Sequence, residues 1–136
     1  VWTTSWPFAE YVRHAWAGAW VNSLFRNESA HLSSDLIREA VAITRDRWND
    51  VPDLGMVTFV DAGKTRRKRD PGRCYLRAGF QPAYCPKHAF LDLILVDCAA
   101  CQSMTEGGLV AVQLLPVDMP TPAKPLFYQP SLWEVA

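Results

Sequence analysis

Two polar residues in the middle of the chain lie where α/β enzymes commonly hold reactive groups. Asp61 directly follows the apolar, β-branched run 55–60, which is typical of a buried central strand. The carboxyl end of such a strand is the edge at which open sheets usually bind ligands. Tyr75 lies in a predicted short helix over 73–78 that Gly79 ends. A carboxylate that accepts a proton and a phenol that donates one can support general acid–base chemistry.

A strongly basic run follows Asp61 closely. Five of the six residues from 64 to 69 are basic in a chain whose formal net charge is zero. They are Lys64, Arg66, Arg67, Lys68 and Arg69. A positive loop beside the expected site would hold a phosphate backbone through salt-sensitive contacts. It would equally suit the phosphates of coenzyme A, and a solvated surface loop is the alternative interpretation.

The start of the clearest predicted helix supplies a second group of candidates. Arg26 can bind a phosphate or a carboxylate through two hydrogen bonds, although an ion pair with Glu28 would explain it equally well. Ser33 or Ser34 is suited to be the N-cap of the helix, which leaves the other serine available to contact a substrate.

Cysteine and histidine pairs later in the chain have spacings that zinc sites use. Cys85 and His88 are separated by two residues, and so are Cys98 and Cys101. Two such chelating pairs would complete a tetrahedral structural zinc site. The intervening segment is apolar and strand-like, so reduced, unliganded cysteines in an insertion over about 83–104 are the alternative.

Hydrophobic periodicity and turn residues predict the elements that would position these groups. Strands are expected over 1–5, 19–26, 55–60, 89–96 and 109–115, with helices over 34–48 and 73–78. Within the second strand, Trp20, Asn22, Leu24 and Arg26 are expected to share one face. The alternation of strands and helices indicates an α/β (α+β) fold with a mixed central sheet flanked by helices.

The composition bounds the class of protein. The chain has 136 residues, of which 49% are hydrophobic, enough for one domain with a buried core over residues 1–115. Five prolines from Pro116 onward describe an extended tail over 116–136. No apolar run is long enough for a membrane span and no signal peptide is evident, so we expect a cytoplasmic protein with reduced thiols. Because the chain begins at Val1 without a methionine, an N-terminal element is expected to be missing.

The segment Arg73-Cys74-Tyr75-Leu76-Arg77-Ala78-Gly79-Phe80 resembles the late helix and following strand of the GNAT superfamily of acyltransferases. By this resemblance, which spans roughly residues 19–115, Tyr75 would protonate the departing coenzyme A thiolate. The helix over 34–48 would be the cofactor-binding helix. The glycine-rich loop that usually precedes that helix in the family is replaced here by the glycine-free residues 26–34, and Glu28 there would repel a phosphate.

The glycine-free loop, the serine at the helix start, the aspartate ending a strand and the tyrosine on the short helix resemble a particular branch, the phage Mom-like proteins. These have a GNAT-type fold and modify adenine in DNA. The resemblance implies a phage- or prophage-encoded transferase that modifies an amino group of a DNA base. It implies a site made of Arg26, Ser33 or Ser34, Asp61 and Tyr75, together with a small-molecule donor such as an acyl-coenzyme A.

Two other functions stay open at this point. One is a conventional acetyl-coenzyme A-dependent N-acetyltransferase acting on a small molecule or peptide. The other is a non-catalytic nucleic-acid-binding module held by zinc through Cys85, His88, Cys98 and Cys101. Coenzyme A binding would favour the first of these alternatives, and a stoichiometric zinc ion would favour the second.

Overall fold

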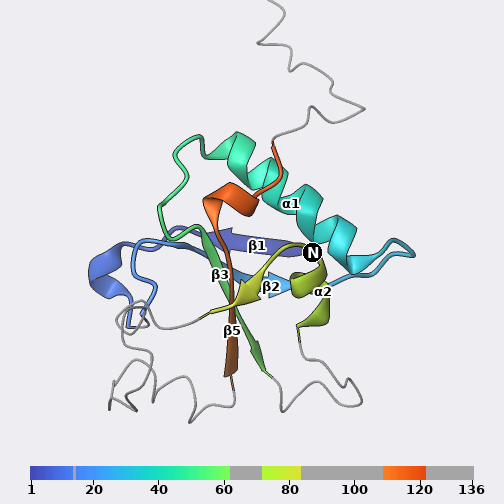
Figure 1. Cartoon of the computed structure of the whole chain (residues 1–136), viewed down its shortest axis with the longest axis horizontal. Helices are drawn as coiled ribbons and strands as arrows, with labels where there is room; N and C mark the ends of the chain where they lie inside the picture. Colours follow the sequence, from blue (N-terminus) through green and yellow to red (C-terminus); the bar gives the residue numbers. More distant parts are fainter. Residues whose placement is uncertain (14, 62–71, 84–108, 122–136) are drawn as a thin grey trace, which may run out of the picture.

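The structure, a computed structural model, describes residues 1–13, 15–61, 72–83 and 109–121. In chain order the elements are β1 (Trp2–Ser5), the 3-10 turn η1 (Ala9–Tyr11), β2 (Trp20–Phe25), α1 (Ser33–Arg47), β3 (Met56–Asp61), α2 (Arg73–Arg77), β4 (Gln81–Pro82), β5 (Leu109–Leu114) and the 3-10 turn η3 (Pro116–Asp118). The strands form one mixed sheet in the order β1-β2-β3-β5-β4 (Figure 1). The α+β class with a mixed central sheet is therefore confirmed.

The sequence patterns located these elements closely. Four of the predicted strands and both predicted helices are present, with bounds that differ by at most one residue at each end. The fifth predicted strand, over 89–96, lies outside the described residues. Gly55, just before β3, has a φ of 67°, and a Cβ there would lie 2.0 Å from the Leu114 carbonyl oxygen. Glycine is therefore required where β3 meets the end of β5.

Helix α1 packs one apolar stripe against the sheet. Ile37, Val41 and Thr44 recur at helical spacing and are buried, because residues three and four apart lie on the same side of a helix. Asp35 in the first turn and the arginines in the last turn have the charges that the helix dipole favours. Thus the amphipathic pattern fixes which face of α1 meets the sheet.

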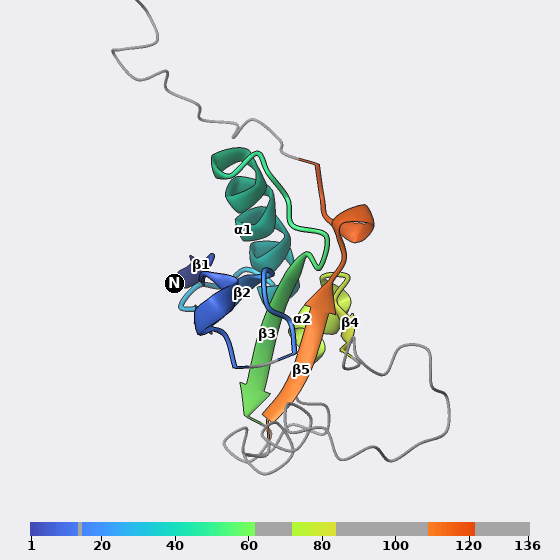
Figure 2. The same cartoon turned by 90° about the vertical axis from the view of Figure 1, so that its left-hand side faces the viewer.

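The two helices lie on the same face of the sheet and contact each other. Figure 2 shows β3 and β5 in front with α2 behind them. The larger core cluster fills the space between helices and sheet and includes Trp20, Met56, Tyr75 and Phe80. A smaller cluster covers the opposite face, where Trp16 packs with alternate residues of β3 and β5. The sheet is therefore covered on both sides over its centre.

A β-bulge interrupts the pairing of β1 with β2. Thr3 and Thr4 are adjacent on β1, but their partners on β2, Leu24 and Asn22, are two positions apart. An extra residue reverses the inward and outward order of the side chains that follow it. Leu24 is consequently 49% exposed, while Phe25 packs against the larger core cluster. The predicted common face of β2 is wrong beyond Asn22 for this reason.

The parallel strands β2 and β3 are paired only over their first three residues. Their pairing comprises Trp20↔Met56, Val21↔Val57 and Asn22↔Thr58, although each strand continues beyond the last pair. Figure 1 shows the two strands diverging, with α2 beside the opening. We call this opening the fork, and its vertex is the pair Asn22↔Thr58.

The first residues of the predicted proline-rich tail pack on the domain. Met119, just after η3, is buried within the larger core cluster, and the Arg45 guanidinium donates a hydrogen bond of 3.4 Å to the Pro120 carbonyl. The remainder of the tail, residues 122–136, lies outside the described residues.

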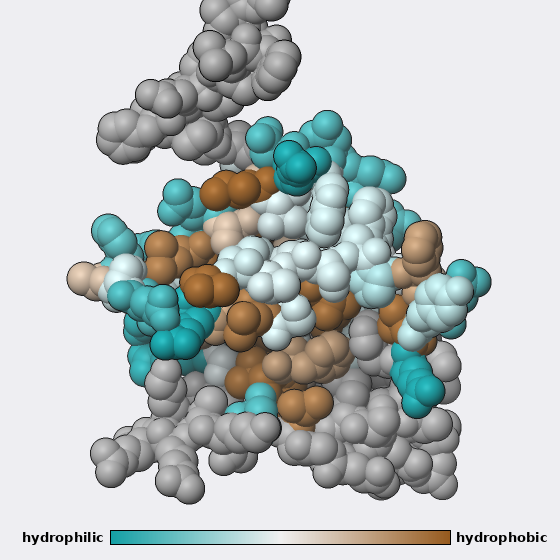
Figure 3. Space-filling view, turned by 180° about the vertical axis from the view of Figure 1, so that it is seen from behind, coloured by the Kyte–Doolittle hydropathy of each residue, from teal (hydrophilic) through white to brown (hydrophobic). Residues whose placement is uncertain are grey.

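Several large apolar side chains also reach the surface. They include Phe8 just before η1, Tyr11 at the end of η1 and Ile43 on α1. In the view from behind, apolar side chains interrupt the hydrophilic surface across the middle of the molecule (Figure 3). Over the part of the chain that the structure describes, no helix is both long enough and apolar enough to cross a membrane.

Candidate functional site

Tyr75 lies in α2 with its ring in the core and its hydroxyl at the vertex of the fork. The residue is 8% exposed, and its phenol hydroxyl donates a hydrogen bond of 2.7 Å to Asn22 Oδ1. Asn22 is itself 2% exposed. This contact joins residues that are 53 positions apart in the chain.

Asn22 and Thr58 complete a buried polar cluster with Tyr75. The Thr58 hydroxyl donates to the Asn22 backbone carbonyl at 2.9 Å and lies 3.4 Å from Asn22 Oδ1. The Asn22 amide nitrogen donates to the backbone carbonyls of Thr3 at 2.9 Å and Leu24 at 3.1 Å. Every polar atom of the Asn22 side chain therefore has a partner, as a buried amide requires.

Burial controls the protonation of this tyrosine. Desolvation raises the pKa of the Tyr75 phenol to about 12 from its ordinary value of 10.0. The Thr58 side chain opposes this shift, and the neighbouring Cys74 adds to it. Tyr75 is consequently a neutral phenol at physiological pH, with its proton directed at Asn22.

Aromatic rings enclose the cluster. Phe25 and Phe80 meet the Tyr75 ring edge to face, with centroids 6.1 Å and 5.2 Å away, and Trp2 in turn meets Phe25 edge to face. Such edge-to-face pairs stabilise a fixed ring orientation. Tyr75 is thus held both by its hydroxyl and by its ring.

The Tyr-x-x-x-Gly-Phe spacing has a local structural cause. The Gly79 amide donates to the Leu76 carbonyl at 3.2 Å, and the Phe80 amide donates to the Tyr75 carbonyl at 3.0 Å. With Gly79 at a φ of 102°, this is a Schellman motif, and the Tyr75–Phe80 ring contact is the apolar contact that usually accompanies it. The helix end alone therefore accounts for the residue types at Gly79 and Phe80, while Tyr75 has the additional contact to Asn22.

Asp61 lies apart from this cluster. It is the last residue of β3 and pairs with Leu109 of β5. Because side chains alternate along a strand, Asp61 shares the face of Val57 and Phe59, whereas the Thr58 side chain interacts with Tyr75 on the other face. The structure brings Tyr75 together with Asn22 and Thr58, and it does not bring Asp61 to them.

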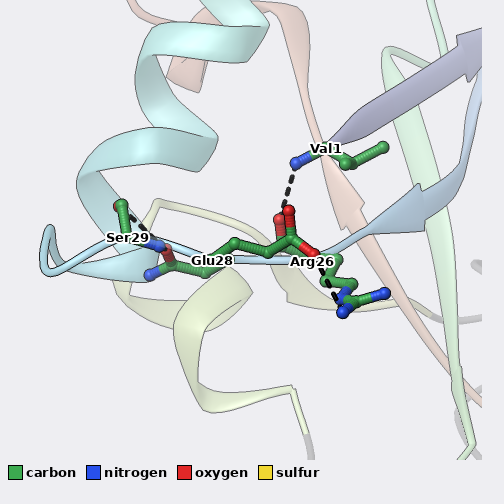
Figure 4. Close-up of polar contacts among 5 residues, drawn as sticks. Val1, Arg26, Glu28 and Ser29 are labelled. Carbon is green, nitrogen blue, oxygen red and sulfur yellow. Dashed lines mark hydrogen bonds and ion pairs between the residues drawn. The ribbon is translucent and has the colours of Figure 1, made fainter.

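The second group of predicted site residues lies in residues 26–32, which we call the helix-start loop, and in the first turn of α1 that follows it; Figure 4 shows part of the loop. The Arg26 guanidinium forms an ion pair of 2.8 Å with Glu28, and the two side chains are 71% and 57% exposed. This is the surface ion pair that the sequence offered as the alternative role for Arg26. The Val1 ammonium donates a hydrogen bond of 2.7 Å to the Arg26 carbonyl.

The Asn27 side chain forms hydrogen bonds across the helix-start loop, which contains no glycine. Its amide nitrogen donates to the His31 carbonyl at 2.7 Å and to the Ser33 hydroxyl at 3.0 Å. Its carbonyl oxygen accepts from both the amide and the hydroxyl of Ser29, at 2.8 Å and 2.9 Å. An asparagine side chain that satisfies its own loop in this way lets the chain turn without a glycine.

The predicted N-cap of α1 is wrong. The N-cap residue is Leu32, and no side chain caps the helix there. Ser33 and Ser34 are instead its first two residues, and the Ser33 hydroxyl is bound by Asn27. Both serines are half-buried at the end of the helix where the dipole favours an anion.

A pocket of about 430 Å³ opens beside the helix-start loop. Trp2 and Phe25 line it from the strands, and Leu36 and Ile43 line it from α1, with Arg26 and Glu28 also contributing. Its size lies within the range of small-molecule sites. Phe25 separates this pocket from Tyr75, because its ring contacts Tyr75 as well.

The other predicted site residues lie outside the described residues. These are the basic residues Lys64, Arg66, Arg67, Lys68 and Arg69 and the metal candidates Cys85, His88, Cys98 and Cys101. Among the residues that the structure does describe, no group of three or more potential ligands is placed to hold a metal ion. The basic loop and the zinc site remain predictions.

The sequence did not identify Asn22 and Thr58 as site residues. A buried asparagine within a strand is an unusual choice, since asparagine is depleted in strands and buried amides need partners. That signal was present in the sequence at Asn22. Nothing local indicated that its partner would be Tyr75.

Comparison with protein-family models, with curated proteins and with solved structures finds no match to this chain. The assignment of a function therefore rests on the residues and the geometry described above.

Proposed function

We propose that this chain is a GNAT-type transferase that modifies an amino group of a DNA base, similar to the Mom-like proteins. The observation that carries the proposal is the fork. Two parallel strands connected through a helix diverge after Asn22↔Thr58, and the hydroxyl of Tyr75 lies at the vertex. The carboxyl ends of parallel strands are where α/β sheets most often bind ligands.

The fork suits an extended donor molecule. Beyond Asn22, no described strand pairs with the edge of β2 that faces β3. An extended ligand with amide groups, such as the arm of coenzyme A, can hydrogen-bond to such an edge as an added strand does. This supports a donor of the acyl-coenzyme A type.

Tyr75 is the proton donor in this proposal. A phenol whose pKa is raised to about 12 stays protonated at neutral pH, so the proton is available to a leaving group at the vertex. Donation requires the hydroxyl to exchange its present hydrogen bond to Asn22 for one to the leaving group.

The start of α1 would bind the anionic part of the donor. Ser33 and Ser34 lie at the helix N-terminus, where backbone amides and the dipole favour an anion. Arg26 would join them only after leaving Glu28, because the two side chains are paired. The proposal therefore includes a rearrangement of this ion pair on binding.

The DNA part of the proposal depends on the sequence. The basic residues from Lys64 to Arg69 would hold the phosphodiester backbone, and the target base would be flipped out of the duplex. Asp61 would orient the exocyclic amine, which requires the base to approach from the end of β3. A cytoplasmic location belongs to the same proposal.

Mass analysis of nucleosides from plasmid DNA, after expression of the complete protein in bacteria, tests the proposal. A new adenosine-derived mass with the wild type, lost in Tyr75→Phe, is the expected result. Tyr11→Phe is the matched control, since Tyr11 is 77% exposed beside η1. Unmodified DNA from cells that contain folded wild-type protein would refute base modification.

A conventional N-acetyltransferase is the second candidate, because the fork favours a transferase without selecting the acceptor. Calorimetric titration of the protein with coenzyme A tests this candidate. Binding without any change in DNA would favour a small-molecule or peptide acceptor. The zinc-held nucleic-acid-binding module is tested by metal analysis of wild type and Cys98→Ser, with one zinc ion per wild-type chain as its expected result.

A further inference from the structure

We propose that Asn22 is a positioning residue that holds the hydroxyl of Tyr75 at the vertex of the fork. This inference deepens the proposed function and rests on the role given there to Tyr75. Asn22 was not among the residues that the sequence pattern selected. The hydrogen bonds of the Asn22 side chain allow it only one orientation.

The orientation of the Asn22 amide is determined by its two donor bonds. Both hydrogens of its amide nitrogen are directed at backbone carbonyl oxygens, those of Thr3 at 2.9 Å and Leu24 at 3.1 Å. Rotating the amide by half a turn would place its oxygen against these two carbonyls, where no hydrogen is available. Asn22 Oδ1 must therefore point toward Tyr75.

The β-bulge makes this arrangement available. Because the bulge falls directly after Asn22, the carbonyl of Leu24 can accept from a side chain only two residues earlier. Bulges recur beside active sites, where they redirect a side chain. Here the bulge lies next to the last residue pair of β2 and β3, so Asn22 lies at the vertex of the fork.

The fixed Oδ1 determines where the Tyr75 proton points. A phenol has one hydrogen to donate, and the 2.7 Å bond gives it to Asn22. The Thr58 hydroxyl donates to the Asn22 backbone carbonyl at 2.9 Å, so Asn22 anchors both of its neighbours. Loss of the Asn22 amide would remove the acceptor to which the Tyr75 hydroxyl donates, while the aromatic contacts would still hold the ring.

Nuclear magnetic resonance of protein carrying ¹³C-labelled tyrosine tests the positioning directly, without any assumption about substrate. Tyr75→Phe assigns the ring signal of Tyr75. In Asn22→Ser, whose side chain is too short to reach the phenol, we expect this signal to shift. We also expect the phenol pKa to fall from about 12, because the smaller side chain admits water and weakens the desolvation that raises the pKa. Thr58→Val is the matched control, since it removes a hydroxyl from the same cluster and retains the Tyr75–Asn22 bond. It should raise the phenol pKa and not lower it, because the Thr58 side chain opposes the upward shift.

An unchanged Tyr75 signal and pKa in folded Asn22→Ser would overturn the proposal. Should that variant fail to fold, Asn22→Asp provides the same decision, because it retains an acceptor for Tyr75 and loses both amide donors. We expect Asn22→Asp to shift the Tyr75 ring signal, because the two donor bonds that fix the orientation of the side chain are lost. An unchanged ring signal in folded Asn22→Asp would contradict the positioning role.

The plasmid nucleoside assay adds a functional readout. If the wild type modifies DNA, Asn22→Ser should lower the rate by about tenfold or more with little change in donor affinity, because misplacing a reacting group mainly slows the chemical step. A full rate in that variant would also overturn the proposal. If the wild type modifies nothing, the proposed function fails while the resonance experiment still decides the role of Asn22.

Discussion

The buried polar cluster includes Asn22 in the middle of β2, and the helix-start loop begins where β2 ends, but the two regions are held together in opposite ways. Asn22, Thr58 and Tyr75 come from three elements, and their hydrogen bonds join residues 36 and 53 positions apart. In the helix-start loop, Asn27 bonds residues between two and six positions away. The cluster is therefore a product of the fold, whereas the loop satisfies itself locally.

The two regions also differ in what their charges can do. The cluster has no formal charge and is screened from water, so each hydrogen bond has its full effect. Arg26 and Glu28 of the loop are mostly exposed, and an exposed ion pair contributes little to stability. The comparison predicts large effects from neutral substitutions in the cluster and small effects from charge changes in the loop.

Asn22→Ala should have the largest effect. It removes the partners of the Tyr75 hydroxyl and of the Thr3 and Leu24 carbonyls at once. We expect the free energy of unfolding to fall by about 3 kcal/mol, since each buried group left unpaired costs roughly 1–3 kcal/mol. Urea denaturation, monitored by circular dichroism, measures this free energy. If Asn22→Ala lowered it by less than Asn27→Ala does, the predicted order of the two regions would be wrong.

Tyr75→Phe should have the next largest effect. It deletes only the hydroxyl, and Asn22 Oδ1 keeps the longer contact to Thr58 at 3.4 Å. A loss of about 1–2 kcal/mol in the free energy of unfolding is expected from one buried hydrogen bond. Tyr11→Phe, measured in the same denaturation series, should change it by less than about 0.5 kcal/mol because that side chain is exposed.

The pH dependence of stability should distinguish the same two tyrosines. The Tyr75 pKa is 10.0 in the unfolded chain and about 12 in the fold, so the contribution of Tyr75 to stability is fully present below pH 10 and is lost as the pH rises through 12. The sign follows because the unfolded state loses this proton first. Urea denaturation at several pH values in this window measures the change. Tyr75→Phe should reduce the fall in the free energy of unfolding between pH 10 and 12. An equally steep fall in this variant would show that other groups cause it.

Asn27→Ala should have a smaller effect than either change in the cluster. It removes bonds at the surface, where water can replace them, so we expect a loss of about 1 kcal/mol in the free energy of unfolding. The ¹³C signal of Tyr75 should stay unchanged. A shift of that signal would show that the loop and the cluster are coupled.

Glu28→Gln should have the smallest effect on stability, within about 0.5 kcal/mol. It frees Arg26 from its ion pair, so binding of an anion at the start of α1 should become tighter if the proposed donor site is correct. Calorimetric titration with coenzyme A measures this change. Arg26→Gln is the matched control, and weaker binding by Glu28→Gln would contradict the assignment of Arg26.

The elements of this fold could be predicted well from the sequence, and the site only in part. Helix α1 was located by its buried stripe, and α2 by Gly79, because these signals lie within a few residues of what they specify. The pairing of Tyr75 with Asn22 had no such signal. The separation of Asp61 from Tyr75 follows from strand alternation, but only once the face on which α2 packs is known.

Local sequence patterns thus determined which helices and strands the chain forms. Tertiary packing determined which side chains of these elements contact one another. The sequence by itself specified four strands, two helices and the Schellman end of α2, since periodicity and glycine placement act over a single turn or strand. The tertiary structure decided the bulge after Asn22, the fork and the contact of Tyr75 with Asn22. These depend on strand register and helix docking, in which one inserted residue reverses the faces of all that follow it.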